Sequence, residues 1–148
     1  MRKAASQVAR LNRDLSRSIA EGHPWLYREA VTVAHALPVG TAVEVVDRRG
    51  RLLGRGLYDP ESPIAVRLYT LDPSETVDEL LVERRLLRAL SIRKHLLSKT
   101  KSDASRANAA ETTGYRLCHG EGDHLPGVVV DIYESAAVVL FDGGAAAT

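Results

Sequence analysis

Hydrophobic residues near the start of the chain recur every three or four positions, at Val8, Leu11, Leu15 and Ile19. That spacing puts apolar side chains on one face of a helix. Gly22 is a helix-ending residue, and Pro24 disfavours the helical conformation of the residue before it. We therefore expect a helix over residues 6–21, followed by a loop at 22–25.

The next part of the chain changes to short β-type segments separated by turn residues. The expected strands are 31–33, 42–46, 51–58 and 64–69. Short, closely spaced strands favour a small barrel or sandwich. Gly54 and Gly56 flank Arg55, which indicates a bulge or a barrel corner, or simply a strand that must curve.

A helical period returns after residue 73. We expect a helix capped by Ser74 or Thr76, with acidic residues in its first turns and Arg93, Lys94 and His95 at its end. Its apolar side chains form a stripe that is wide enough for the helix to pack against two neighbouring elements. Residues 98–113 contain no large apolar side chain, so we interpret them as a linker at a domain boundary.

Three further strands are expected at 115–121, 128–133 and 137–141, with a Gly-rich turn at 122–127. A three-stranded meander has an open edge, and nothing in the remaining sequence covers its apolar face. We therefore expect residues 98–148 to form a homodimer or to be partly disordered.

Composition restricts the class of protein. The 148 residues are 45% hydrophobic and contain no apolar run long enough for a membrane span and no signal peptide, so we expect a cytoplasmic protein without a membrane partner. One cysteine, Cys118, excludes an internal disulfide and a multi-cysteine zinc site, and no metal site is expected.

The net charge of +1 first argues against a nucleic-acid partner, but it averages four blocks of opposite sign. Residues 1–28 carry +4, 29–83 carry −5, 84–106 carry +7 and 107–148 carry −5. Two basic blocks are compatible with one cationic face.

No complete catalytic constellation is present in the sequence. The acidic and histidine residues around the Gly-rich turn suit a metal or acid–base site, but turn formation explains them better. That group comprises His119, Glu121, Asp123, His124 and Asp131. The turn precedes a strand rather than a helix, so it does not fit a cofactor loop, and Cys118 is expected to be a buried thiol.

The candidate binding residues are basic and aromatic. Arginines suit phosphate contacts, and His23 or Trp25 suits an unpaired base. The alternatives are a solvated helix face for the arginines and, for Trp25, a core aromatic that tethers the loop to the barrel. The predicted RNA-binding residues are Arg10, Arg13, Arg17, His23, Trp25, Arg28 and Arg55; Arg85, Arg88 and Lys99 are ambiguous in the same way.

Three motifs together carry a family resemblance. They are GHPWLY at 22–27, VDRRGRLLGRGLYDPESPIAVRLYT at 46–70 and YRLCHGEGDHLPGVVVDIY at 115–133. In this order and spacing they resemble the N-terminal part of the S-adenosylmethionine-dependent 23S rRNA cytosine-5 methyltransferases that begin with a PUA domain.

The resemblance implies an α+β fold in three parts. Residues 1–75 would be a PUA-like RNA-binding domain, a small β-barrel with helices; 76–113 a basic helix and linker; and 114–148 the opening β-meander of an incomplete central α+β domain. The family's methyl-donor loop, its Asp-Pro-Pro motif and its catalytic cysteine would lie beyond residue 148, and Cys118 does not occupy the nucleophile position.

These observations lead to one functional hypothesis and two alternatives. The chain is expected to bind RNA, namely 23S rRNA, as the front of a methyltransferase, with no cofactor of its own and no activity alone. The alternatives are a stand-alone RNA-binding accessory protein and a module that docks on an acidic protein.

Overall fold

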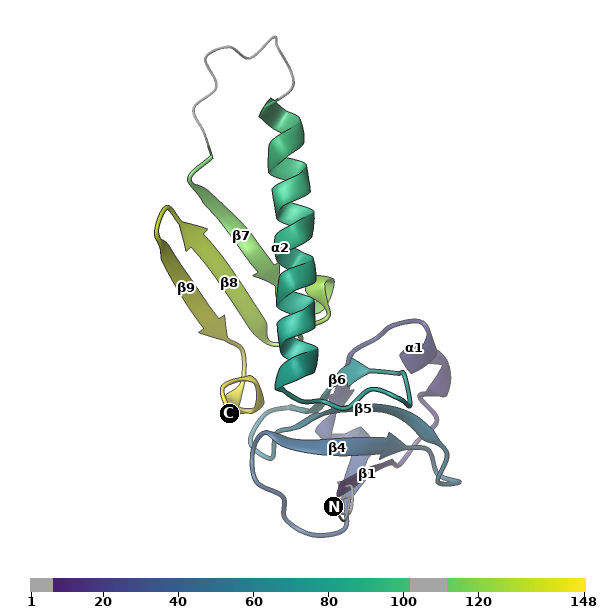
Figure 1. The fold of residues 1–148 in the computed structure, drawn as a ribbon. Helices are drawn as coiled ribbons and strands as arrows, with labels where there is room; N and C mark the ends of the chain where they lie inside the picture. The colour runs from purple at the N-terminus through teal and green to yellow at the C-terminus, as the bar shows by residue number, and fades with distance from the viewer. Residues whose placement is uncertain (1–6, 102–111) are drawn as a thin grey trace, which may run out of the picture.

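The computed structural model describes residues 7–101 and 112–148, with side chains of the long helix described as far as residue 97. In these residues two β-sheets are joined by one long helix (Figure 1). The α+β class predicted from the sequence is confirmed.

The first sheet has six strands in the order β2-β6-β5-β4-β1-β3 and curls into part of a barrel. Strand β1 runs parallel to β4, and the other neighbours are antiparallel. The strands are β1 (Gln7–Leu11), β2 (Trp25–Tyr27), β3 (Val31–Val33), β4 (Thr41–Val46), β5 (Leu52–Tyr58) and β6 (Ile64–Thr70). The four strands expected between residues 31 and 69 are confirmed to within a residue.

The predicted helix over residues 6–21 is wrong for its first half. Residues 7–11 form β1, and helix α1 is the short segment Ser16–Ala20. Ala9 and Leu11 are both buried, so alternate positions of β1 face the core between β3 and β4. Pairing on both sides supplies β1 with backbone hydrogen bonds, and this tertiary gain overrides the helical spacing of the apolar residues.

Strand β5 bends where the two glycines lie. Its pairing with β6 shifts register between Arg55 and Gly56, which confirms the expected bulge. A Cβ at Gly56 would lie 2.1 Å from the carbonyl oxygen of Arg67, so only glycine allows this approach of the two backbones.

Helix α2 (Glu79–Lys101) leads from the first sheet to the second. Its N-terminal cap is Asp78, whose Oδ1 accepts the Leu81 N–H at 2.9 Å, rather than the predicted Ser74 or Thr76. The helix continues to Lys101, so the start of the predicted linker at 98–113 is helical. Residues 102–111 of that prediction lie outside the described residues.

The second sheet has the order β7-β8-β9, formed by β7 (Gly114–His119), β8 (Val128–Tyr133) and β9 (Ala136–Phe141). Helix α2 packs against β7, so the expectation that nothing covers the meander is wrong on this face. Leu81 of α2 shares a buried core with Cys118, Leu125 and Val130, and Tyr69 of β6 joins it. All six residues of β9, by contrast, are exposed.

The C-terminal residues return to the first sheet. The 3₁₀ turn η4 (Gly144–Ala146) is held by the Ala145 N–H, which donates to Asp59 Oδ2 at 3.3 Å. The nearly buried Arg67 pairs with Asp142 at 2.8 Å. These contacts fix residues 142–146 between the two sheets. In the described parts of the chain, no helix has the length and apolar character of a membrane span.

Candidate functional site

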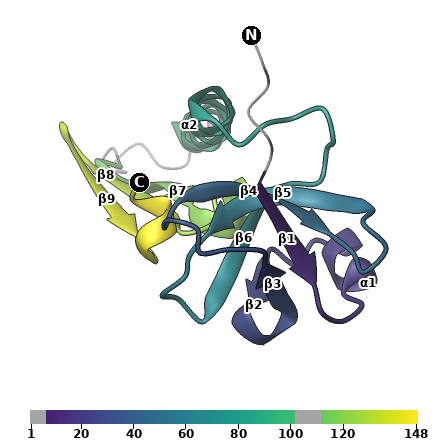
Figure 2. The ribbon, with the colours of Figure 1, turned by 90° about the horizontal axis from the view of Figure 1, so that it is seen from below.

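Three of the predicted arginines lie on or between the first two elements of the chain, β1 and α1. Arg10 is on β1, Arg13 follows it, and Arg17 is on α1 (Figure 2). All three are exposed. Arg13 pairs with Glu29 at 3.5 Å and Arg17 with Glu21 at 2.8 Å. Exposed pairs of this kind contribute little stability, so an incoming phosphate can replace the carboxylates at small cost.

His23 and Trp25 form an aromatic corner just after α1. Their rings meet edge to face with centroids 6.0 Å apart. The backbone N–H of Trp25 donates to His23 Nδ1 at 3.2 Å. A neutral His23 therefore carries its proton on Nε2. The corner opens on a cavity of about 630 Å³ that is also lined by Ser18 and Glu121.

Trp25 connects this corner to the second sheet. Its Nε1–H donates to Glu121 Oε1 at 2.8 Å, and the side chain is half-buried. The alternative of a tethering tryptophan is thus favoured by the geometry, although the tether reaches η3 (Gly120–Asp123) rather than the barrel alone. An RNA contact by His23 or Trp25 stays a prediction.

Arg28 and Arg55 are held by the protein itself. Arg28 donates to the carbonyl oxygens of Asp59 and Ser62, and this holds the β5–β6 turn. Arg55 pairs with Glu44 at 2.8 Å and donates to the carbonyl oxygens of residues 73 and 75. Only 15% of the Arg55 side chain is exposed. RNA contacts by these two residues remain predictions, and the geometry gives them structural roles.

The structure adds three arginines that the sequence interpretation left out. Arg48, Arg49 and Arg51 lie in the β4–β5 turn, beside Arg10 and Arg13. Their signal in the sequence is the local run of basic residues in VDRRGR, which lies within residues 29–83, a segment whose net charge is −5. The first sheet therefore carries one basic surface made from the two sequence segments 10–17 and 48–51.

The residues of the Gly-rich turn hold the second sheet together. Asp123 accepts two hydrogen bonds of 2.6 Å from Arg93 and one of 2.7 Å from the His119 N–H. Burial opposes ionisation, but these donors outweigh it and lower the pKa of Asp123. Asp131 is paired with Arg116, and the described residues include no group of three or more potential metal ligands.

Neither Cys118 nor the Gly-rich turn is suited to methyl transfer. Burial raises the pKa of the Cys118 thiol, whose Sγ lies 3.4 Å from the Val128 carbonyl oxygen. A thiol in such surroundings is a poor nucleophile. The turn forms η3 and then β8, so no helix N-terminus is available there to bind a methyl donor, and the residues present do not fit S-adenosylmethionine.

Hydrogen bonds between the two sheets set their relative positions. The Tyr69 hydroxyl donates to the Pro126 carbonyl oxygen at 3.0 Å, and burial raises the pKa of Tyr69 to about 12. Arg85 of α2 donates to the carbonyl oxygen of His124. Together with the Trp25–Glu121 bond, these contacts hold the aromatic corner against η3.

Comparison with known proteins agrees with this architecture. Residues 9–71 match the family model of the PUA-like domain. The chain is 36% identical over 137 residues to ribosomal RNA large subunit methyltransferase I of Alteromonas mediterranea, covering 92% of this chain and 32% of that protein. For the Escherichia coli protein of the same name the identity is 35% over 131 residues, covering 87% and 31%.

Solved structures show the same fold. A Streptococcus mutans protein assigned to the SAM-dependent methyltransferases superposes with a TM-score of 0.61 at 16% identity, over 92% of this chain and 33% of that one. A methyltransferase structure in complex with SAH gives the same TM-score and identity over 87% and 30%. The chain spans about a third of the length of the curated relatives it matches. Residues 9–71 therefore match the PUA-like domain, and the resemblance of the chain to the PUA-domain-containing rRNA methyltransferases is confirmed over that third.

Proposed function

We propose that this chain binds RNA, namely 23S rRNA, through its PUA-like domain, as the N-terminal portion of a cytosine-5 methyltransferase of the cytoplasm. The observation that carries the proposal is that Arg10, Arg13 and Arg17 are all exposed on β1, after it and on α1, the helix that the aromatic corner follows in the chain. Arginine contacts to phosphates with a neighbouring aromatic group suit RNA that contains unpaired bases.

Salt dependence tests this proposal directly. Fluorescence anisotropy of a labelled rRNA hairpin with an unpaired loop should show binding with a Kd on the order of 1 μM that weakens steeply between about 50 and 200 mM salt. The double variant Arg13→Glu with Arg17→Glu should weaken binding at least about 30-fold, because two phosphate contacts become repulsive. Arg88→Glu with Lys94→Glu on α2 makes the same charge change elsewhere and should weaken binding much less.

Two results would contradict the proposal. Absence of salt-dependent RNA binding would remove it and leave the docking module for an acidic protein as the better hypothesis. Equal losses in both double variants would show that RNA responds to overall charge rather than to this surface.

We expect methyl transfer to be catalysed by full-length members of the family and not by these 148 residues alone. S-adenosylmethionine would be the methyl donor there, and we expect the 148-residue chain to show no heat of binding when titrated with it, since the Gly-rich turn does not fit a donor. A measurable stoichiometric binding isotherm would show that this expectation is wrong.

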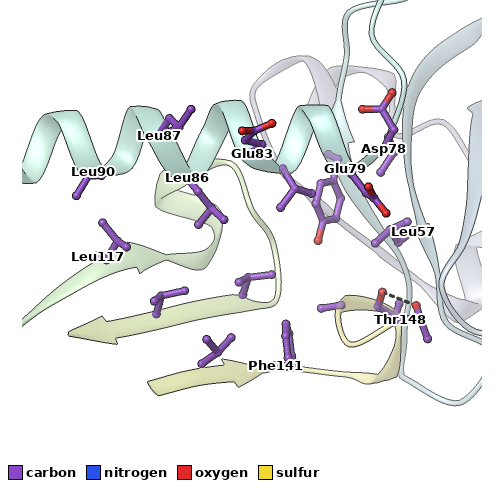
Figure 3. A pocket seen from close by; sticks show the side chains of 18 residues that line it. Leu57, Asp78, Glu79, Glu83, Leu86, Leu87, Leu90, Leu117, Phe141 and Thr148 are labelled. Atoms are coloured by element: carbon purple, nitrogen blue, oxygen red, sulfur yellow. Dashed lines mark hydrogen bonds between the residues drawn. The ribbon is translucent and has the colours of Figure 1, made fainter. Parts of the chain in front are cut away.

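A homodimer is a second proposal about partners. Strand β9 leaves Val138, Leu140 and Phe141 exposed, and an apolar groove of about 800 Å³ lies between α2 and the second sheet. Figure 3 shows Leu86 and Leu90 of α2 pointing toward this groove. A second copy could pair with the β9 edge and cover these side chains. Light scattering at increasing concentration tests it, and a monomer throughout would refute it.

A further inference from the structure

The β4–β5 turn is a rigid platform for three arginines. Asp47 Oδ1 accepts the N–H groups of Arg49 and Arg51 at 2.8 and 2.9 Å, and the Gly50 N–H donates to the Asp47 carbonyl oxygen at 3.0 Å. Gly50 has a φ of +87°, a conformation that glycine adopts without strain. The turn is therefore held in one shape, with its arginine side chains directed outward from a fixed backbone.

Neighbouring elements hold this turn against the start of α1. Arg10 of β1 donates to the carbonyl oxygens of Asp47 and Arg48 at 3.2 and 3.4 Å. Arg51 Nη2 lies 3.5 Å from Ser16 Oγ of α1. The turn, β1 and α1 thus enclose a surface depression of about 740 Å³. Its lining comprises Arg13, Asp14, Ser16, Asp47, Arg48, Arg49 and Arg51.

The depression favours an anion. Four of its lining residues are arginines, and its two carboxylates already accept backbone N–H groups. Within residues 7–101 and 112–148, Arg48 and Arg49 have neither an ion pair nor a side-chain hydrogen bond, and both are exposed. Two guanidinium groups on a fixed turn are thus available to a ligand, and guanidinium matches phosphate oxygens in geometry.

Its position points to a polyanion that passes around the short helix α1. Ser16 lines this depression, and Ser18 lines the cavity of the aromatic corner, two residues further along the same helix. Each helical residue turns by about 100°, so Ser16 and Ser18 lie about 200° apart around the axis, and the two hollows open on different sides of the short α1. A single phosphate would fill only one of them, whereas an RNA strand can place phosphates in the first and an unpaired base at the second.

We propose that Arg48 and Arg49, with Arg13, form a binding site for the phosphate groups of the RNA backbone, on the other side of α1 from the aromatic corner. This inference rests on the proposed RNA-binding function. It adds a site that contacts the RNA backbone and does not distinguish one base sequence from another. The turn residue Asp47 and the strand residue Arg10 position these arginines and do not themselves need to contact the RNA.

The test compares the salt dependence of RNA binding in the full chain. Single-stranded U, A and C oligonucleotides of equal length are titrated between 50 and 200 mM salt with the wild type and with Arg48→Ala plus Arg49→Ala. Each lost phosphate contact lowers the slope of log affinity against log salt by about 0.7 on single strands. The double variant should therefore have a slope lower by about 1.4 and bind roughly 25-fold more weakly near 0.1 M salt, equally for all three sequences.

Two matched variants separate position from charge. Arg48→Lys plus Arg49→Lys keeps both charges and should keep the wild-type slope, with a modest loss of affinity. Arg88→Ala plus Lys94→Ala removes two exposed charges from α2 and should also keep the slope. Circular dichroism melts verify that each variant is folded, as expected for exposed side chains of a turn.

The outcomes of these titrations distinguish failure of the phosphate site from failure of the proposed function. If the wild type binds RNA and the double alanine variant keeps its slope, the phosphate site is refuted while the proposed function stands. A loss restricted to one of the three sequences would also refute it, because backbone contacts weaken binding uniformly. If the wild type binds no RNA, the proposed function itself fails, and this site fails with it.

Discussion

The ion pair between Arg93 and Asp123 offers a quantitative test of how α2 and the second sheet are held together. Two hydrogen bonds of 2.6 Å join the guanidinium to the carboxylate, and the His119 N–H adds a third of 2.7 Å. The Asp123 side chain is 6% exposed and that of Arg93 is 20% exposed. Asp123→Asn keeps the shape but replaces one acceptor with an NH₂ group that faces a donor.

The expected cost follows from burial. Breaking a buried pair by changing one partner costs about 3–5 kcal/mol. Because Arg93 keeps some access to water and the asparagine keeps one acceptor, we expect the free energy of unfolding to fall by about 2–4 kcal/mol. For a chain of this size that corresponds to a fall in Tm of roughly 5–12 °C.

Thermal and urea unfolding should be followed by two signals. Circular dichroism reports on the whole chain, and the fluorescence of Trp25, its single tryptophan, reports on the contact with Glu121. Asp131→Asn is the matched control: it breaks a bidentate pair with Arg116 in the same sheet, where 47% of the arginine side chain is exposed. That change should cost less than about 1 kcal/mol.

The same pair predicts a pH dependence. Burial alone would raise the pKa of Asp123, but the Arg93 and His119 donors lower it below its ordinary value. A lowered folded-state pKa stabilises the fold above the unfolded-state value of about 3.9, and this contribution is lost as pH falls through the folded-state pKa. The difference between wild type and Asp123→Asn should therefore shrink below pH 4. Equal Tm values at pH 7, or a loss as large in Asp131→Asn, would refute the reasoning.

Three further predictions concern single residues. Gly56→Ala should destabilise the first sheet by about 2 kcal/mol or more in a thermal melt, because the new Cβ would lie 2.1 Å from a β6 carbonyl oxygen. Gly122→Ala is the control and should cost much less, because its Cβ would lie 3.5 Å from the nearest atom. Glu121→Gln should weaken the hydrogen bond of Trp25 and shift its fluorescence emission with a loss of stability of about 1 kcal/mol; an unchanged spectrum would contradict the contact. Leu81→Ala, at a position that is 1% exposed, should cost about 2–5 kcal/mol in urea unfolding, and a smaller loss would mean that the second core is loosely packed.

Most strands could be predicted because their signals are local. Turn residues mark the ends of the strands from β3 to β6, and the apolar residues of each strand lie between these turns. The prediction for β1 was wrong because its apolar residues are spaced three to four positions apart, which suits a helix. Its parallel partner β4 lies more than thirty residues away in the sequence. Local spacing carries no information about such a pairing.

The candidate site was predicted in part. Arg10, Arg13 and Arg17 are all exposed, and their contact with RNA is still a prediction. Arg55 looked available in the sequence and is in fact paired with Glu44. The turn arginines do not stand out in the sequence because residues 29–83 have a net charge of −5, and only the fold brings them to one surface with Arg13.

The sequence by itself determined the fold class, the strands between residues 31 and 70, and the family resemblance, because these depend on short-range patterns and on motifs in a fixed order. Only the tertiary structure decided which charges remain available. Pairing of β1 with β4 brings residues 10–17 beside residues 48–51, and the fold at the same time occupies Arg28, Arg55 and Arg93 with partners. The physical reason is that the attraction between charges depends on their separation and burial in space, and neither can be read from their distance along the chain.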